Sequence, residues 1–508
     1  MKIKSVLFTL CLVAATAANS ANYYVSPAGS GLKDGSSFEN AFDVEAFTAQ
    51  AAANVNGDNY YFAAGLYYIP STVVFQVATG ANLYGASEGD QRTVFSGDAN
   101  GNNNPDDGES SRLIRFQANT VDGNSTNAIL VKDIDFTCVF TNTDDSSNNS
   151  GALAIDNSGD VTVENCNFYN NWAQGTQGGP AAYLYRSTVR FVGCQFSNNK
   201  ANYRGGAIRI NSNANTKGVV TFENCVIKNN LSYHDLGGAI FAANFKSITL
   251  VNSTVYGNEA KSGRGGAIYF NGFSSAADGY PRLLQIINST IAGNTTGEAE
   301  NDGQIATTQS AHIYIANSLI PSGNGVASIA FTGDVQADAV VLISGGYNYI
   351  GSIASSLDDS PELTWLETDT YGEACTYASI FGENTLSQGK VVMPATFVLG
   401  ATGSQVADAL TAASENSWNF PIGVDYSVDQ LGNERTGQKT PGAVAMTAEE
   451  IKANEDSSSA VELVSESSMV TVYNLQGVAV RVNVNKSDAL SNLPAGVYIA
   501  GGKKYIVR

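Results

Sequence analysis

The sequence predicts an all-β protein built mainly as a right-handed parallel β-helix. Three observations predict this fold: a recurring glycine phrase, a column of asparagines that keeps step with it, and the lack of helical periodicity between them. The phrase Gly-Gly-Ala-Ile begins at Gly205, Gly237 and Gly265, and its second glycine belongs to a series spaced 28, 27, 32 and 28 residues apart. That series is Gly151, Gly179, Gly206, Gly238 and Gly266. Units of this length, made of short apolar runs and turn residues, are typical of one coil of such a solenoid.

Stacking of coils explains the repeated columns. Equivalent residues of successive coils lie about 4.8 Å apart in a parallel ladder. A column of asparagines can pass amide hydrogen bonds from coil to coil while its residues adopt the left-handed turn conformation. The two glycines make a sharp turn before the inward-facing Ala-Ile pair. We therefore expect a structural ladder made of Asn171, Asn199, Asn230, Asn258 and Asn294.

A second column holds thiols at Cys166, Cys194 and Cys225, each five residues before a ladder asparagine. Stacked Cα atoms fall within the disulfide distance range, but parallel side chains give a poor torsion and three neighbours cannot all pair. We expect a buried, reduced ladder. A disulfide is the alternative, because the chain is expected to be exported.

Residues 1–20 have the pattern of a secretory signal peptide. Lys2 and Lys4 precede an apolar stretch from Val6 to Ala15, and small residues follow. No later stretch approaches the roughly 18 apolar residues of a spanning helix, so we expect no transmembrane helix after signal removal. The net charge of −20 and the pI of about 4.4 exclude nucleic acid and anionic lipid as partners, because those partners need basic patches.

Residues 21–110 are expected to form the N-terminal cap and the first coils. Asp43 is a candidate N-cap for a short helix that covers the open end of the solenoid. The stretches NYYVSPAGSGLKDG (22–35) and NYYFAAGLYYIP (59–70) resemble the start of pectate-lyase-like β-helix proteins of bacterial surfaces.

Residues 111–446 are expected to hold the β-helix repeats and closing strands. The phrase GGAI together with FxxN, at Phe168–Asn171 and Phe196–Asn199, resembles the repeat of chlamydial polymorphic outer membrane proteins, which implies a β-helical adhesin. GGYNYIGSI (345–353) and DQLGNERTGQKTPGAVAM (429–446) are similar to bacterial choice-of-anchor Q β-helix proteins. That resemblance implies an architecture with a C-terminal anchor and no particular reaction. It assigns to a closing strand the residues Asp429, Gly432, Arg435, Gly442 and Ala443.

The last two segments are predicted to be an acidic linker (447–460) and a small antiparallel β-sandwich (461–508). Three features of the second closely resemble the C-terminal sorting domain of the type IX secretion system of Bacteroidota. They are Tyr473 to Gly477 (YNLQG), Leu493 to Tyr498 (LPAGVY) and the basic Lys503-Lys504 finish. The resemblance implies the type IX machinery as a partner and attachment at the cell surface.

No catalytic set and no binding residues are identified from the sequence. Asn142-Thr143-Asp144-Asp145 is similar to part of the polygalacturonase aspartate cluster, but neither His234 nor His312 has the glycine setting of that family. We interpret Asp144-Asp145 as a solvated turn. Three arginines, Arg204, Arg209 and Arg264, accompany the glycine phrase. We place Arg209 outward, and Arg204 and Arg264 stacked before the turn. A solvated surface is the interpretation, and contact with a sugar carboxylate is the alternative.

One loop could wrap Ca²⁺, and no other cofactor is expected. Asp98, Asn100, Asn102 and Asp106 place oxygen side chains at alternating positions beside a turn glycine. The spacing of an EF-hand loop is missing, and a flexible loop that leaves the solenoid is the favoured interpretation.

These inferences favour an exported, outer-membrane-attached surface protein that acts as a non-catalytic adhesin or glycan-binding protein, with an extracellular glycan or a host surface as ligand. One alternative is a polysaccharide lyase or glycoside hydrolase that acts on acidic polysaccharide. Another is a structural surface scaffold. Aromatic residues gathered on one outward face would distinguish binding from a scaffold.

Overall fold

The structure is a computed structural model, and it divides the chain into two compact units, Met1–Met446 and Thr447–Arg508. The predicted signal peptide, except its last residue, and the Asp144-Asp145 pair lie outside the described residues. The described residues are 20–54, 57–106, 111–118, 128–142, 151–176, 178–212, 218–271, 282–297, 302–308, 311–323, 325–332, 340–355, 362–382, 392–414, 418–460, 469–474, 479–485, 493, 496–500 and 503–507.

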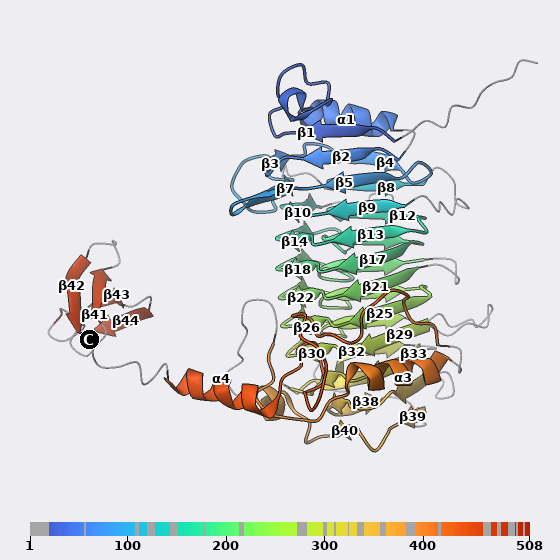
Figure 1. The fold of residues 1–508 in the computed structure, drawn as a ribbon, viewed down its shortest axis with the longest axis vertical. Coiled ribbons are helices and arrows are strands. Elements are labelled where there is room, and N and C mark those ends of the chain that lie inside the picture. Colours follow the sequence, from blue (N-terminus) through green and yellow to red (C-terminus); the bar gives the residue numbers. More distant parts are fainter. Residues whose placement is uncertain are drawn as a thin grey trace, which may run out of the picture. The chain divides into compact units, whose positions relative to one another are not determined.

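The first unit consists of parallel sheets stacked along one axis, which confirms the predicted fold class (Figure 1). Each coil contributes one strand to each of three or four sheets, so sequence neighbours belong to different sheets.

Sheet I contains β1 (Asn22–Val25), β2 (Asn59–Phe62), β5 (Ala81–Tyr84), β9 (Ile129–Lys132), β13 (Val161–Glu164), β17 (Thr188–Val192), β21 (Val219–Glu223), β25 (Ser247–Val251), β29 (Arg282–Ile287), β33 (Ala311–Ala316), β36 (Val340–Ser344) and β39 (Glu362–Thr364). Sheet II contains β3 (Gly65–Tyr68), β7 (Gln91–Ser96), β10 (Ile134–Thr137), β14 (Asn167–Tyr169), β18 (Gln195–Ser197), β22 (Val226–Lys228), β26 (Thr254–Tyr256), β30 (Thr290–Ala292), β34 (Leu319–Ile320), β37 (Tyr349–Ile350) and β40 (Thr370–Tyr371), with β6 (Ser87–Glu88) antiparallel to β7.

Sheet III is the shortest and contains β11 (Phe140–Thr141), β15 (Trp172–Ala173), β19 (Lys200–Ala201), β23 (Leu231–Ser232), β27 (Glu259–Ala260) and β31 (Thr295–Thr296). Sheet IV contains β4 (Val73–Gln76), β8 (Ile114–Gln117), β12 (Leu153–Asp156), β16 (Ala182–Tyr185), β20 (Ile208–Asn211), β24 (Ile240–Ala243), β28 (Ile268–Asn271), β32 (Gly303–Thr308), β35 (Ala327–Phe331) and β38 (Ile353–Ser355).

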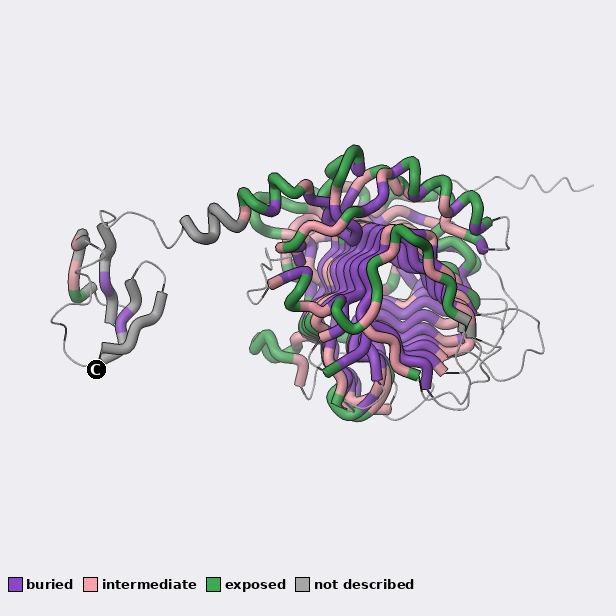
Figure 2. Tube along the Cα trace, turned by 90° about the horizontal axis from the view of Figure 1, so that it is seen from below, coloured by how far each residue is buried: buried purple, intermediate pink, exposed green. Residues whose placement is uncertain are grey.

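The core lies between the sheets and is made of identical or similar side chains stacked in columns. Viewed along the axis, the buried strands of successive coils superpose (Figure 2). Phe136, Phe168 and Phe196 stack with ring centroids 4.8 Å apart at each step and nearly parallel planes. The second residues of the Ala-Ile pairs, Ile208, Ile240 and Ile268, are fully buried, so the glycine phrase does turn these side chains inward.

The two glycines of the phrase are needed for different reasons. Gly205 has φ of 85°, a conformation that side chains disfavour. Gly206 lacks such a φ, but a Cβ there would come within 2.1 Å of the carbonyl oxygen of Gly238 in the next coil. Backbone conformation therefore selects the first glycine, and close packing of coils selects the second.

Helices cover parts of the solenoid. Helix α1 (Val44–Ala53) follows η1 (Phe38–Asn40) and lies across the N-terminal end (Figure 1). Asp43 caps α1 by accepting a hydrogen bond from the backbone N–H of Ala46 at 2.9 Å, which confirms the predicted helix. Helix α2 (Tyr377–Phe381) packs on the outer face of sheet II, and α3 (Gly403–Ser414) on that of sheet I.

The second unit contains α4 (Ala448–Ala460), formed by the segment that the sequence assigns to an acidic linker. Its strands form one antiparallel sheet in the order β42 (Ala479–Asn485), β41 (Met469–Asn474), β43 (Gly496–Ala500) and β44 (Lys503–Val507). Among the described residues, no helix is both long enough and apolar enough to span a bilayer.

Candidate functional site

The asparagine column lies inside the solenoid, at the turn after sheet II. The Nδ2 atom of Asn171 donates to Oδ1 of Asn199 at 2.9 Å, and the same bond continues through Asn230 and Asn258 to Asn294 at 2.8–2.9 Å. Gln304 takes the next position, accepting from Asn294 Nδ2 at 3.0 Å. Each Oδ1 atom also accepts a backbone N–H of the preceding coil, so the buried amides are fully used inside the fold.

The left-handed turn conformation belongs to the neighbouring residue. Asn170, Asn198 and Asn229 have φ of 54°, 57° and 55°, whereas the ladder asparagines that follow them do not have positive φ. The predicted left-handed conformation is therefore wrong by one position. The two roles fall to different residues: the second asparagine of each pair points its amide into the solenoid and bonds to the next coil, and the first adopts the left-handed conformation of the turn.

The thiol column is buried. Cys166, Cys194 and Cys225 are free cysteines with exposed fractions of at most 1%. The Sγ atom of Cys194 lies 3.3 Å from the carbonyl oxygen of Val163, and burial raises the pKa of the Cys166 and Cys194 thiols. Buried thiols with raised pKa values are poor nucleophiles, so this column has the properties of core packing.

The loop considered for Ca²⁺ brings its four residues together, but their oxygens accept hydrogen bonds from the loop itself. Asp98 accepts from the backbone N–H groups of Gly101 at 2.7 Å and Asn103 at 2.9 Å. The two carboxylate oxygens of Asp106 accept from the amides of Asn100 and Asn102 at 3.0 and 2.6 Å. A cation would have to compete with these donors for the same oxygens.

The three arginines do not form one row. Arg209 does point outward from sheet IV, but it is only 5% exposed, and its guanidinium carbon lies 5.5 Å from the centre of the Tyr183 ring. The solvated interpretation is therefore wrong for Arg209, whose pKa burial lowers. Leu236 lies between Arg204 and Arg264 in the stack of coils. The backbone N–H of Gly205, next to Arg204, donates to the carbonyl of Leu236, and that of Gly237, next to Leu236, donates to the carbonyl of Arg264.

The outward face of sheet IV gathers aromatic rings, and most of them are buried. Phe241 and Tyr269 stack with centroids 5.8 Å apart, and Arg204 lies over Phe241. Tyr183, Phe241 and Tyr269 are 3–6% exposed. These three rings therefore do not offer an accessible platform for a ligand.

Residues 429–446, which we call the staple, form no strand and are held by hydrogen bonds of buried side chains. The carboxylate of Asp429 accepts from the backbone N–H groups of Asn433 and Ala445 at 2.8 and 3.0 Å, and Arg435 donates to the carbonyl of Gly442 at 2.6 Å. Within residues 418–446, all of them described, the pairing is limited to an isolated bridge between Val428 and Glu434. The predicted closing strand is wrong, because side chains rather than a ladder hold this segment: Ala443 N–H donates to Thr290 Oγ1 at 2.9 Å.

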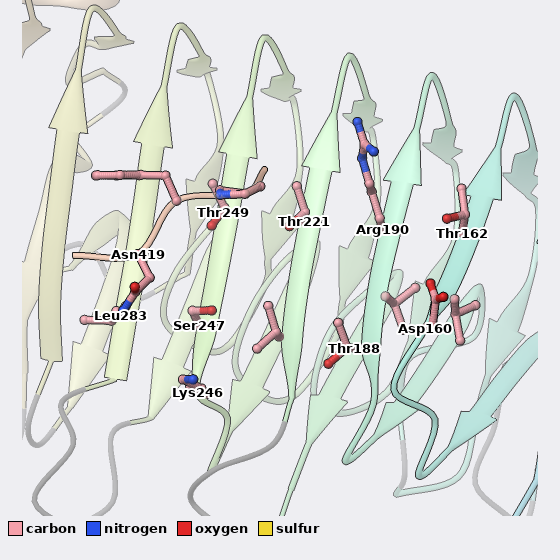
Figure 3. A pocket seen from close by; sticks show the side chains of 15 residues that line it. Asp160, Thr162, Thr188, Arg190, Thr221, Lys246, Ser247, Thr249, Leu283 and Asn419 are labelled. Carbon is pink, nitrogen blue, oxygen red and sulfur yellow. The ribbon is translucent and has the colours of Figure 1, made fainter. Parts of the chain in front are cut away.

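An accessible pocket of about 390 Å³ lies on the outer face of sheet I, and we call it the trough (Figure 3). Two rows of outward side chains, in register across neighbouring strands, form its floor. One row is Asp160, Thr188, Val219, Ser247 and Leu283. The other is Thr162, Arg190, Thr221 and Thr249.

A later segment forms the wall of the trough. Residues 418–426, which we call the strap, cross the outer face of sheet I and contribute Asn419, Phe420 and Pro421 to the lining (Figure 3). Gln285 holds the strap by accepting from Thr249 at 2.6 Å and donating to the carbonyl of Asn419 at 2.9 Å. Asn252 and Asn288 donate to the strap carbonyls of Asp425 and Tyr426 at 3.2 and 3.1 Å.

The charges of the trough are of two kinds. Arg190 pairs with Glu223 through Nε, 3.0 Å from the carboxylate, and through Nη2. Lys246 and Asp160 are exposed, and neither has an ion pair within the described residues. Burial, together with Glu223, raises the pKa of Tyr426 to about 12, so its hydroxyl stays a donor to the strap carbonyl of Pro421 at 3.2 Å.

Sequence reasoning missed the trough. One floor row repeats threonine at three of its four positions, but Arg190 interrupts that row and the wall comes from more than 100 positions later, so no motif marks the trough. The usable signal was the run of polar residues at alternating positions of the sheet I strands, such as Thr188 and Arg190 in β17.

Residues 107–280 match a family model described as a right handed beta helix region. No curated protein matches the chain. Among solved structures, the chain is similar to a rhamnogalacturonan lyase, with a TM-score of 0.38 and 15% identity over 59% of this chain and 74% of that chain. It is also similar to a pectate lyase (TM-score 0.28, 14% identity, 64% and 80%) and to the surface protein and adhesin PfbA of Streptococcus pneumoniae (TM-score 0.27, 12% identity, 65% and 95%). The stacked sheets and the matched region together establish the fold as a right-handed parallel β-helix.

Proposed function

We propose that this chain is an exported surface protein that binds a glycan in the trough without cleaving it. The observation that carries the proposal is the built character of the trough: a floor of hydroxyl and charged side chains held in register, and a wall anchored by Gln285. Its volume lies within the range of about 300–1,000 Å³ that is usual for small-molecule sites.

The chemistry of the lining suits a sugar. Sugars carry many hydroxyl groups that need hydrogen-bond partners, and the hydroxyls of Thr188 and Ser247 can both donate and accept. Leu283 and Phe420 supply apolar surface for the C–H faces of a ring. Asp160 is the only carboxylate among the described lining residues, whereas general acid–base cleavage of a glycosidic bond uses two carboxylates. The lining therefore favours binding over hydrolysis.

A glycan array with the full chain, followed by calorimetry on the hits, tests the proposal. Thr188 is exposed on the trough floor, so Thr188→Trp should fill the trough and abolish binding without unfolding the protein. Glu259→Trp, at an exposed position of sheet III, is the matched control and should bind like the wild type. Equal binding by both variants would place the ligand elsewhere. Release of new reducing ends or unsaturated sugars from the hits would replace the proposal with a catalytic one.

For delivery, we propose the type IX route through residues 461–508. The resemblance of the YNLQG, LPAGVY and Lys503-Lys504 features supports this route, as does the separate compactness of Thr447–Arg508. A chain truncated after Met446 should accumulate inside a Bacteroidota host, while the full chain reaches the surface. Equal surface amounts of the two chains would contradict the proposal.

A further inference from the structure

A second pocket, of about 660 Å³, lies near the C-terminal end of the solenoid, at the beginning of sheet IV strands β35 and β38. Its lining is mostly apolar or small and includes Val326, Ala327, Ile353 and Ala354, with the hydroxyls of Ser322, Ser352 and Thr376. One ionisable carboxylate, Asp302, is part of the described lining. None of these residues belongs to the trough.

Asp302 stands where the glycine phrase ends. Ile240, Ile268 and Ile305 are partners in successive strands, so Asp302 occupies the position that Gly237 and Gly265 hold in the coils before it. In those coils the glycine N–H donates to a backbone carbonyl of the next coil, as from Gly237 to Arg264 at 2.8 Å. At the last step the carboxylate replaces that carbonyl: Oδ1 of Asp302 accepts from Gly265 N–H at 3.2 Å and from Gly303 N–H at 2.7 Å.

The other oxygen of this carboxylate has no such use. Asp302 is 2% exposed, and among the described residues its Oδ2 atom accepts no hydrogen bond of normal geometry, although the Thr296 side chain interacts with the carboxylate. Burial raises the pKa of Asp302 to about 6, against the lowering effects of the backbone N–H groups, of Thr296 and, most weakly, of Arg264. At neutral pH the group is therefore mostly ionised, and a buried anionic oxygen without a donor costs free energy that a bound ligand would recover.

We propose that this pocket binds a small organic cation, a primary ammonium group on a polar molecule such as an amino sugar, with Oδ2 of Asp302 as the acceptor. An ammonium group supplies three donors and a compensating charge, and charge-assisted hydrogen bonds are about twice as strong as neutral ones. Bare divalent cations fit less well, because Ca²⁺ takes six to eight oxygen ligands and no group of three or more potential ligands of the His, Cys, Asp or Glu type gathers among the described residues. The volume leaves room for a body larger than the ammonium group, and the alanines give it an apolar wall.

Calorimetry on the full chain at pH 7.5 tests this site, with glucosamine as the probe and glucose as its neutral counterpart. We expect saturable binding of glucosamine and at least about tenfold weaker binding of glucose. Asp302→Asn keeps the Oδ1 acceptor for Gly265 and Gly303 and should weaken glucosamine binding by a similar factor. Asp408→Asn, an exposed position on α3, is the matched control and should bind like the wild type.

Two further variants keep the test decisive. Ala354→Phe fills the pocket from strand β38 and leaves the Asp302 carboxylate in the chain; it should also abolish glucosamine binding, so the result does not rest on one substitution. Thr188→Trp in the trough should leave glucosamine binding unchanged, which separates this site from the proposed glycan site. Equal affinity for glucosamine and glucose, or unchanged binding by Asp302→Asn and Ala354→Phe, would overturn the proposal.

Discussion

The outer face of sheet I has two halves that share one backbone arrangement and differ in what covers them. From β9 to β21 the outward side chains include Lys132, Glu164 and Arg190, which are partly exposed. From β25 to β33 the column at one end of the strands is apolar, and Val251, Ile287, Tyr314 and Ala316 form a second core with α3 and Trp418. The strands stack identically in both halves. The comparison shows that one coil ladder carries charged, polar and apolar outward residues, and that the later coils differ because α3 and Trp418 pack on their apolar side chains.

The sharpest way to break the comparison is to place a charge in the covered half. Val192 and Val251 lie in one outward column, two coils apart, with Glu223 between them. Val251 is fully buried, so Val251→Asp would bury an unpaired carboxylate and should lower the free energy of unfolding by at least about 4 kcal/mol. Val192 is partly exposed, and Val192→Asp should change it by less than about 1 kcal/mol. Urea unfolding measures the free energy of unfolding of both variants, and similar losses would show that the covering segments do not make position 251 differ from position 192.

The next largest effect concerns the staple, residues 429–446, which follows the strap that crosses sheet I. Asp429 is 1% exposed and accepts hydrogen bonds from Leu431, Asn433 and Ala445 N–H groups at 2.8–3.0 Å. Asp429→Ala leaves these donors without their acceptor and should cost about 3 kcal/mol. Asp425→Ala, an exposed position in the strap, should cost less than about 1 kcal/mol. Limited proteolysis should then cut near residue 430 only in the Asp429 variant; cleavage in neither variant would show that the staple is not what holds the cover.

The sequence predicts the solenoid better than the candidate sites, because the solenoid needs similar residues at equivalent positions of many coils. The ladder continues from Asn171 through Asn199 only where each coil places an amide side chain at this position, as Gln304 does at the end, so the period of the β-helix is visible in the sequence. The doublets Asn170-Asn171 and Asn198-Asn199 leave open which asparagine turns left-handed, and the structure assigns it to the first.

The candidate sites depend on residues that do not recur in this way. The trough combines Arg190 with Phe420, which lies far along the chain, and their proximity depends on where the strap crosses the sheet. Asp302 breaks the glycine column once, and a single departure from a repeat has no period to reveal it. The sequence also does not show which coils are covered by later segments, because Val251, which is covered, and Val192, which is not, are the same residue type in the same column.

A smaller effect, of about 2 kcal/mol, separates the earlier coils of the solenoid from the later ones by pH. In the earlier coils, buried or partly buried carboxylates pair with arginines: Asp135 with Arg92 at 2.9 Å and Asp156 with Arg115 at 2.6 Å. Asp302, in the later coils, has a pKa raised to about 6, so the folded state binds its proton more tightly than the unfolded state does. Stability should therefore rise as the pH falls from 7 towards 4, by up to about 2 kcal/mol from this group. The difference between the wild type and Asp302→Asn across that pH range isolates the effect, and a difference that does not vary with pH would contradict it.

The smallest effect is expected at the N-terminal end of the open face. Tyr24, Tyr61 and Tyr84 stack outward in one column, with ring centroids 5.5 and 4.9 Å apart, and remain partly exposed. Tyr84→Ala removes one stacking contact that no cover depends on, so it should lower the free energy of unfolding by about 1 kcal/mol. Tyr84→Phe keeps the ring and should leave stability unchanged. If Tyr84→Ala instead lowered the free energy of unfolding as much as Val251→Asp, the tyrosine column would be part of the packing. Outward contacts would then stabilise the uncovered coils of sheet I as they stabilise the covered ones.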